Sequence, residues 1–165
     1  MIRVLGIDPG LASMGWGVVE IDGTRYRHIA HGVIKTSPRA SPGERLMKLH
    51  HEIKSIISTY GPEQSGVEDL YFAKNATSAI PVAQARGVVL LALTELGVNI
   101  GEYSPQAIKQ AIVGQGRAEK HQVQELVRML LGLESIPKPD HASDALAAAI
   151  CHITHTVGES YVSQH

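Results

Sequence analysis

The sequence predicts an α/β fold: a mixed five-stranded sheet, made of an antiparallel meander and parallel β–α–β strands, with helices on both faces. Two observations lead to this prediction. Three apolar segments follow one another at the N-terminus, and Asp22-Gly23, a dipeptide typical of β-hairpin turns, separates the second from the third. After these, helical patterns alternate with short apolar runs, which is the order typical of parallel β–α–β units.

The expected strands are short apolar runs bounded by turn residues. Consecutive strands joined by tight turns pair antiparallel, whereas strands joined through a helix pair parallel. We therefore expect the first three strands to form the meander and the last two to extend the sheet beside them. The predicted strands cover residues 2–8, 15–21, 25–35, 64–70 and 98–103.

The expected helices are recognised by their start and stop signals. The first has a capping Ser41, Pro42 at its first position and Glu44 three residues after the cap, and Gly61-Pro62 ends it. The second is rich in alanine, which suits either plain core packing or the contact face of a dimer. The predicted helices cover residues 42–60, 78–96, 104–113, 119–131 and 140–155.

Length and composition limit the classes of protein that fit. A chain of 165 residues with no long linker suits one domain, which we expect over residues 1–157, followed by a flexible tail over 158–165. No apolar run approaches the ~20 residues needed to span a bilayer, and the start lacks the basic and apolar regions of a signal peptide. The single cysteine, Cys151, excludes an internal disulfide, so we expect a cytoplasmic protein with no membrane partner. The formal net charge is −1, so any surface that binds nucleic acid must be a local basic patch.

Two predicted strands carry a carboxylate where a buried strand should be apolar. Asp8 ends the first strand, and its simplest role is to cap the turn at Pro9-Gly10. Glu68 lies in a second buried strand, which weakens that simple interpretation because an unpaired buried carboxylate costs several kcal/mol. Two such groups repel each other unless a cation lies between them, so the pair indicates a metal site.

The last predicted helix adds a third group of candidate ligands. We interpret Asp140 as its N-cap. His141 and Asp144 are three residues apart, so they share one face of the helix. Carboxylates with one imidazole suit Mg²⁺ or Mn²⁺, and two such ions about 4 Å apart can hydrolyse a phosphodiester, with Asp8 bridging them.

These residues belong to a larger pattern of six segments, which are GIDPG (residues 6–10), GWG (15–17), VED (67–69), AKN (73–75), QARG (84–87) and DHASDAL (140–146). With these segments in this order, residues 2–155 resemble the RuvC family of crossover junction endonucleases. The resemblance implies an RNase H-like nuclease domain, a homodimer, and symmetric nicking of Holliday (four-way) DNA junctions in recombination and repair, alongside the RuvA–RuvB branch-migration complex.

The resemblance also implies roles for single residues. The metal ligands are Asp8, Glu68, His141 and Asp144, and they hold two Mg²⁺ ions per active site, for which Mn²⁺ can substitute. Many family members have Asp where this chain has His141, so the site carries one negative charge fewer. Tyr71 contacts unstacked bases at the junction centre, where ordinary core packing is the alternative. The predicted DNA-binding residues are Tyr71, Phe72, Lys74, Arg86, Lys109, Arg117 and Lys120, and Lys109 and Lys120 are also predicted to be catalytic.

Several alternatives remain open from sequence. From the residues alone, Lys109 and Lys120 are better explained as solvated surface lysines, and it is the resemblance that favours a role at the active site. The glycines around Asp8 do not form a nucleotide-binding loop, and we expect them to let DNA and metal approach closely. The rival functions are a nucleotide-binding ATPase of the actin and sugar-kinase type, an RNA nuclease of the same fold, and a junction-binding protein without catalytic activity.

Overall fold

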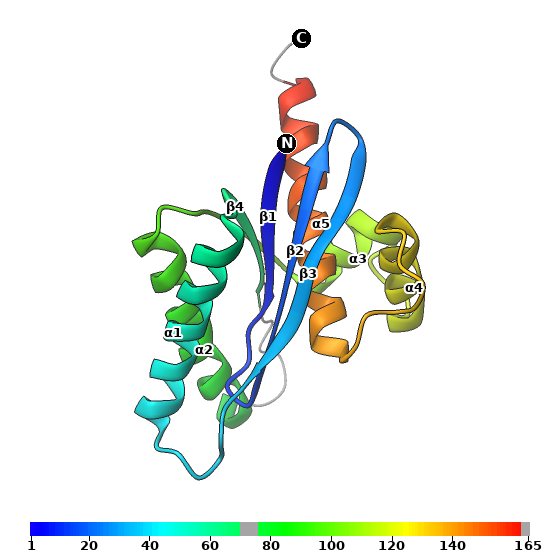
Figure 1. The fold of residues 1–165 in the computed structure, drawn as a ribbon. Coiled ribbons are helices and arrows are strands. Elements are labelled where there is room, and N and C mark those ends of the chain that lie inside the picture. Colours follow the sequence, from blue (N-terminus) through cyan, green and yellow to red (C-terminus); the bar gives the residue numbers. More distant parts are fainter. Residues whose placement is uncertain (70–75, 163–165) are drawn as a thin grey trace.

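The computed structural model describes residues 1–69 and 76–162 and confirms the predicted α/β architecture (Figure 1). One five-stranded sheet separates two layers of helices. The strands are β1 (Ile2–Asp8), β2 (Ser13–Asp22), β3 (Arg25–Lys35), β4 (Gln64–Glu68) and β5 (Asn99–Tyr103). The helices are α1 (Pro42–Tyr60), α2 (Ala76–Glu95), α3 (Pro105–Val113), α4 (Lys120–Leu130) and α5 (Asp140–Val162).

The sheet has the strand order β3-β2-β1-β4-β5. β1 pairs antiparallel with β2, and β2 pairs antiparallel with β3, so the predicted meander is confirmed. β4 pairs parallel with β1 on one side and with β5 on the other, as expected for strands reached through helices. β1 and β4 are therefore neighbours at the centre of the sheet, and both end at the same edge.

Some element boundaries differ from the predicted ones. The hairpin turn is Gly23-Thr24 rather than Asp22-Gly23, because Asp22 still pairs with Arg25 in the ladder. Helix α5 continues beyond the predicted end at His155 to Val162, because a single glycine costs a helix only about 1 kcal/mol and does not end it. The predicted capping box of α1 is present, with Ser41 and Glu44 exchanging hydrogen bonds.

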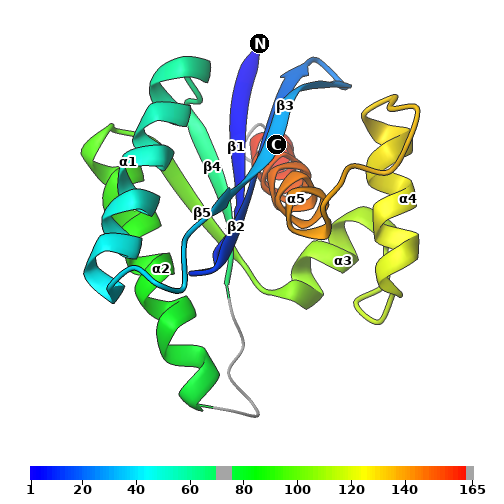
Figure 2. The same cartoon turned by 60° about the horizontal axis from the view of Figure 1, so that its bottom comes forward.

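Two hydrophobic cores lie on opposite faces of the sheet. Helices α1 and α2 cover one face, and α5 with α3 and α4 covers the other (Figure 2). Side chains alternate between the two faces along each strand. Leu5 and Ile7 of β1 therefore join the core under α1 and α2, while Val4 joins the core under α5.

Helix α5 lies directly against the backbone of the central strands because glycines line its path. A Cβ atom at Gly6 would lie 1.8 Å from the carbonyl oxygen of Ala145, and one at Gly15 would lie 1.9 Å from that of His141. A Cβ at Gly66 of β4 would likewise come within 2.3 Å of a helix carbonyl oxygen. We call Gly6, Gly15 and Gly66 the glycine bed. The expectation that glycines near Asp8 make room for DNA is therefore wrong for Gly6 and Gly15, because they make room for α5.

Helix α2 corrects the expectation that no segment of the chain is apolar over the length needed to span a bilayer. Its segment Thr77–Glu95 is long and apolar enough, by length and mean hydropathy alone, to cross a membrane. The helix nevertheless packs on the sheet, with Ala85, Val89 and Leu93 buried in the core shared with α1. Part of its apolar surface faces outward instead, which identifies α2 as a core helix with a second apolar face.

Candidate active site

Strand alternation places Asp8 and Glu68 side by side on one face of the sheet. In β1, Asp8 follows Val4 and Gly6 on the face that α5 covers, and in β4, Glu68 follows Gly66 on the same face. Ile7 and Val67 are register partners in the parallel pair, so the two carboxylates come next to each other at the ends of neighbouring strands. The two acidic residues predicted from separate strands are thus brought together.

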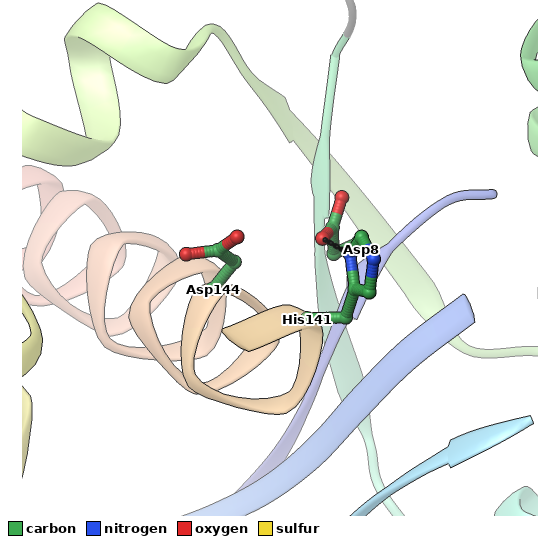
Figure 3. Close-up of side chains that lie close together, drawn as sticks. All are labelled: Asp8, His141 and Asp144. Atoms are coloured by element: carbon green, nitrogen blue, oxygen red, sulfur yellow. Dashed lines mark hydrogen bonds and ion pairs between the residues drawn. The ribbon is translucent and has the colours of Figure 1, made fainter. Parts of the chain in front are cut away.

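The start of α5 brings two further ligand groups to this edge of the sheet (Figure 3). His141 Nδ1 lies 3.0 Å from Asp8 Oδ2. Ligand atoms of Asp8, His141 and Asp144 all lie within 4.8 Å of one another. His141 lies against β2 through its backbone contact at Gly15, so the helix is held where its first turn reaches the end of β1.

Glu68 completes the group through its contact with Asp8. The two side chains share a hydrogen bond, which requires one of the two carboxyl groups to hold a proton. Burial, and then the charge of Asp8, raises the pKa of Glu68 to about 8. Burial also raises the pKa of Asp8 to about 6, although the hydrogen bond with Glu68 acts in the opposite direction. Burial therefore disfavours the charged form of both carboxyl groups, and Glu68 is shifted further than Asp8.

The raised pKa values of these carboxyl groups are those of a site that fits a divalent cation. Burial raises the pKa of Asp144 as well, with Lys120 opposing the shift. Burial thus raises the pKa of three neighbouring carboxyl groups, and a cation bound among them would favour their ionised forms. Oxygen ligands with a single imidazole are a donor set that Mg²⁺ and Mn²⁺ accept. The arrangement can hold a divalent metal.

A pocket of about 210 Å³ opens beside these carboxylates and contains both predicted lysines. Lys109 reaches it from α3, and Lys120 reaches it from the first turn of α4. Lys120 Nζ lies 3.5 Å from Asp144 Oδ2. The pocket is lined by Glu68, Pro105, Ile108, Lys109, Lys120, Val123, Asp144 and Ala147. A negatively charged wall and two ammonium groups therefore face the same space.

The other predicted DNA-binding residues are placed differently. Tyr71, Phe72 and Lys74 lie outside the described residues. Arg86 of α2 forms ion pairs with Glu102 of β5 and with Asp69, which directly follows Glu68. Arg117 lies in the turn between α3 and α4 and is not among the residues that line the pocket. The contacts of these residues with DNA stay predictions.

Asp140 has a role that the sequence did not indicate. It was interpreted as the N-cap of α5, but it is the first residue of the helix, and its carboxylate accepts hydrogen bonds from side chains of α4. Its partners are Lys120, with Nζ 3.2 Å from Asp140 Oδ2, and Gln124. The sequence held no local signal for these contacts, because they join two helices that are distant in the chain.

Comparison with known families gives one consistent result. The family model described as "Crossover junction endodeoxyribonuclease RuvC" matches residues 4–152. A protein of that name from Treponema denticola is 54% identical over 150 residues, which cover 91% of this chain and 84% of that protein. Another, from Heliobacterium modesticaldum, is 50% identical over 148 residues, which cover 90% of this chain and 91% of that protein.

Solved structures agree with this result. RuvC of Thermus thermophilus superposes with a TM-score of 0.90 at 37% identity, covering 96% of this chain and 97% of that one. The same protein in complex with a Holliday junction substrate superposes with a TM-score of 0.88 at 35% identity, covering 95% of this chain and 96% of that one. The yeast mitochondrial Holliday junction resolvase Ydc2 has a TM-score of 0.72 at 13% identity, covering 97% of this chain and 81% of that one, and shares the fold alone. The RNase H-like type of the sheet and its helices is thereby confirmed.

Proposed function

The chain belongs to the RuvC family of crossover junction endodeoxyribonucleases, and from this premise we propose that it resolves Holliday junctions by paired nicks in two opposing strands. It is a nuclease that hydrolyses phosphodiester bonds, and its role lies in homologous recombination and DNA repair. The observation that carries the proposal is the convergence of Asp8, Glu68, His141 and Asp144 at one edge of the sheet. Family membership leaves the ATPase, the RNA nuclease and the non-catalytic binding protein without support.

The proposed ligands of two Mg²⁺ ions are these four residues, with Mn²⁺ as a substitute. When bound, such ions activate a water molecule and stabilise the leaving oxygen of a phosphodiester. Asp8 contacts both Glu68 and His141, so it is the ligand best placed to be shared. Because the pKa of Glu68 is raised, the binding of a cation by this carboxylate would favour loss of its proton.

The two lysines of the pocket provide the positive charge that faces the substrate. A phosphodiester that approached Asp8 and Asp144 would be repelled by their carboxylates. Lys109 and Lys120 line the same pocket and can neutralise the phosphates on either side of the scissile bond. This pairing supports a catalytic role for both lysines over the alternative of solvated surface residues.

The outward face of α2 supports a homodimer. Ile80 and Leu91 are exposed, and their spacing of three helical turns places them on one face of the helix. Gly87 lies between them on that face, and no atom lies within 4 Å of the position of a Cβ there. An apolar stripe with a glycine at its centre suits close contact with the same stripe of a second copy about a twofold axis. Two active sites related by such an axis would produce paired nicks.

Two further assignments rest on family membership. The protein works with the RuvA–RuvB branch-migration complex, which delivers junctions to it. It acts in the cytoplasm, where the chromosomal junctions of a bacterial cell are found, and the fold is that of a soluble nuclease. The apolar composition of α2 is explained by the core and the dimer, so neither assignment involves a membrane.

The decisive experiment compares three substrates. The protein is incubated with Mg²⁺ and a mobile four-way junction, a linear duplex or an RNA–DNA hybrid. We expect symmetric nicks in the junction alone, loss of cleavage in Asp8→Asn, and full cleavage in Asp22→Asn, which changes a carboxylate at the far end of the β1–β2 ladder. Equal cleavage of the junction and the linear duplex would contradict junction resolution, and cleavage of the hybrid alone would favour the RNA nuclease.

A further inference from the structure

The ammonium group of Lys120 lies between two carboxylates that belong to different parts of the molecule. Its Nζ is 3.2 Å from Asp140 Oδ2 and 3.5 Å from Asp144 Oδ2. Lys120 is the first residue of α4, where the helix dipole disfavours a positive charge. The local helix therefore does not explain a lysine at this position, but the two carboxylates do.

The two carboxylates differ in their surroundings. Asp144 belongs to the cluster with Asp8 and His141 and is half-buried. Asp140 lies outside that cluster, and 64% of its side chain is exposed. A hydrogen bond from Gln124 Nε2 to Asp140 Oδ1, 3.2 Å long, fixes the orientation of the Asp140 carboxylate toward α4. Asp140 thus offers Lys120 a partner that is not itself a candidate metal ligand.

We propose that Asp140 is a positioning residue that holds Lys120 at the mouth of the catalytic pocket and limits its competition with a divalent cation for Asp144. The inference rests on the proposed function, because it assumes that Asp144 is a metal ligand. It adds a residue outside the four predicted ligands and the predicted DNA-binding residues.

The physical reason is the sharing of one positive charge. An ammonium group and a divalent cation cannot both approach the same carboxylate oxygen closely, because like charges repel. While Asp140 binds Lys120, only part of the attraction of the ammonium group is directed to Asp144. An arriving cation can therefore displace the ammonium group from Asp144 while it remains bound to Asp140. Lys120 then stays over the pocket, bound to Asp140, where it can meet a phosphate. Without Asp140, the ammonium group would pair with Asp144 alone and oppose metal binding more strongly.

The test is a double-mutant cycle with metal binding as its first readout. Mn²⁺ is titrated calorimetrically into the DNA-free full-length protein, as wild type, Asp140→Asn, Lys120→Gln and the double variant. Because Lys120 and Asp140 are both more than half exposed, we expect Asp140→Asn to weaken Mn²⁺ binding by about three- to fivefold in the presence of Lys120. In the Lys120→Gln background the same change should weaken it less, because the direct charge of Asp140 near the site is lost but no ammonium group is released onto Asp144. An equal effect in both backgrounds, including no effect, would overturn the inference.

Two further variants separate positioning from charge and from folding. Gln124→Ala removes a hydrogen bond to Asp140 without changing any charge, so it should weaken Mn²⁺ binding in the same direction but less. Asp22→Asn removes a carboxylate far from the site and should have no effect. If Asp8→Asn leaves Mn²⁺ binding unaltered, the metal site itself is refuted, and with it the proposed function. If Asp140→Asn has an equal effect in both backgrounds and Gln124→Ala has none, the positioning role alone is refuted.

The cleavage reaction gives a second readout. With saturating Mn²⁺ and junction, Asp140→Asn should lower kcat by about tenfold while changing junction affinity little, because Lys120 is present but no longer held over the pocket. Asp140→Glu, which keeps the charge on a longer side chain, should restore part of kcat. A loss in junction affinity with kcat unchanged would contradict the positioning role.

Discussion

Replacing Glu68 with glutamine should stabilise the metal-free protein while abolishing its activity. Glutamine has nearly the shape of the protonated glutamate and can still donate a hydrogen bond to Asp8. It cannot acquire the negative charge that the buried site resists. The free energy of unfolding of Glu68→Gln should therefore exceed that of the wild type, and the difference should grow with pH.

The size of the effect follows from the pKa of Glu68. This pKa is raised from 4.5 to about 8 in the folded protein, so the folded state holds a proton that the unfolded chain releases. The associated stability is fully present below the unfolded pKa and is lost as the pH rises through the folded pKa. Linkage gives a loss of about 1 kcal/mol near pH 5 and about 4 kcal/mol near pH 8, so the two proteins should diverge by about 3 kcal/mol over this range.

The assay is urea unfolding of both proteins in the presence of a chelator at several pH values. Groups remote from Glu68 titrate alike in both proteins, so their contributions cancel in the difference and leave that of the interacting Asp8–Glu68 pair. Glu134→Gln, at an exposed position, serves as a control and should follow the wild type at every pH. Added Mg²⁺ should restore the stability of the wild type near pH 8 and have little effect on Glu68→Gln. A difference between the wild type and Glu68→Gln that stays constant from near pH 5 to near pH 8 would refute the reasoning.

Four further predictions test the remaining roles. Lys109→Ala should reduce cleavage about tenfold without changing the melting temperature, and the affinity of the wild type for junctions should fall steeply with salt; an unchanged cleavage rate would return Lys109 to the solvated surface. Tyr71→Ala should impair cleavage of intact junctions more than of junctions with a pre-opened centre, because a stacked base contributes ~1–3 kcal/mol, and equal losses would indicate packing instead. His141→Asp should strengthen Mn²⁺ binding, as measured by calorimetry, because it adds one negative charge to the cluster with Asp8 and Asp144; unchanged binding would exclude position 141 from the metal site. The proposed dimer predicts that the wild type sediments as a dimer and Leu91→Glu as a monomer in analytical ultracentrifugation, and that this variant makes single nicks instead of paired ones; a variant that stays dimeric would exclude this face of α2.

The features predicted well from sequence are those with a local physical signal. Ser41 and Glu44 specify the start of α1 through contacts within one turn, and the structure has both hydrogen bonds. Asp8 and Glu68 were recognised because a carboxylate in an apolar strand is unusual whatever surrounds it. That the ends of β1 and β4 are neighbours is a finding of the structure, because the predicted meander left open which of its edges the later strands join.

The features that sequence did not reveal depend on contacts between distant segments. Asp140 looks like a helix cap in isolation, and only the packing of α4 beside α5 gives it Lys120 as a partner. Arg86 looks like a candidate phosphate ligand, yet the fold places it between Asp69 and Glu102. In both cases the residue type was informative, but its partner was set by tertiary structure.

Because of the glycine bed, the position of α5 at the active site does not depend on the size of the side chains in the hydrophobic core under α1 and α2. Helix α5 meets the strands through main-chain atoms at Gly6, Gly15 and Gly66, so the distance from Asp8 to His141 does not depend on how large side chains fit together. Substitutions within the core under α1 and α2 should therefore lower the yield of folded enzyme and leave the turnover of each folded molecule intact. A single methyl group added at Gly6 should lower both the yield and the turnover, because it clashes with the main chain of α5 and moves His141 and Asp144 away from Asp8.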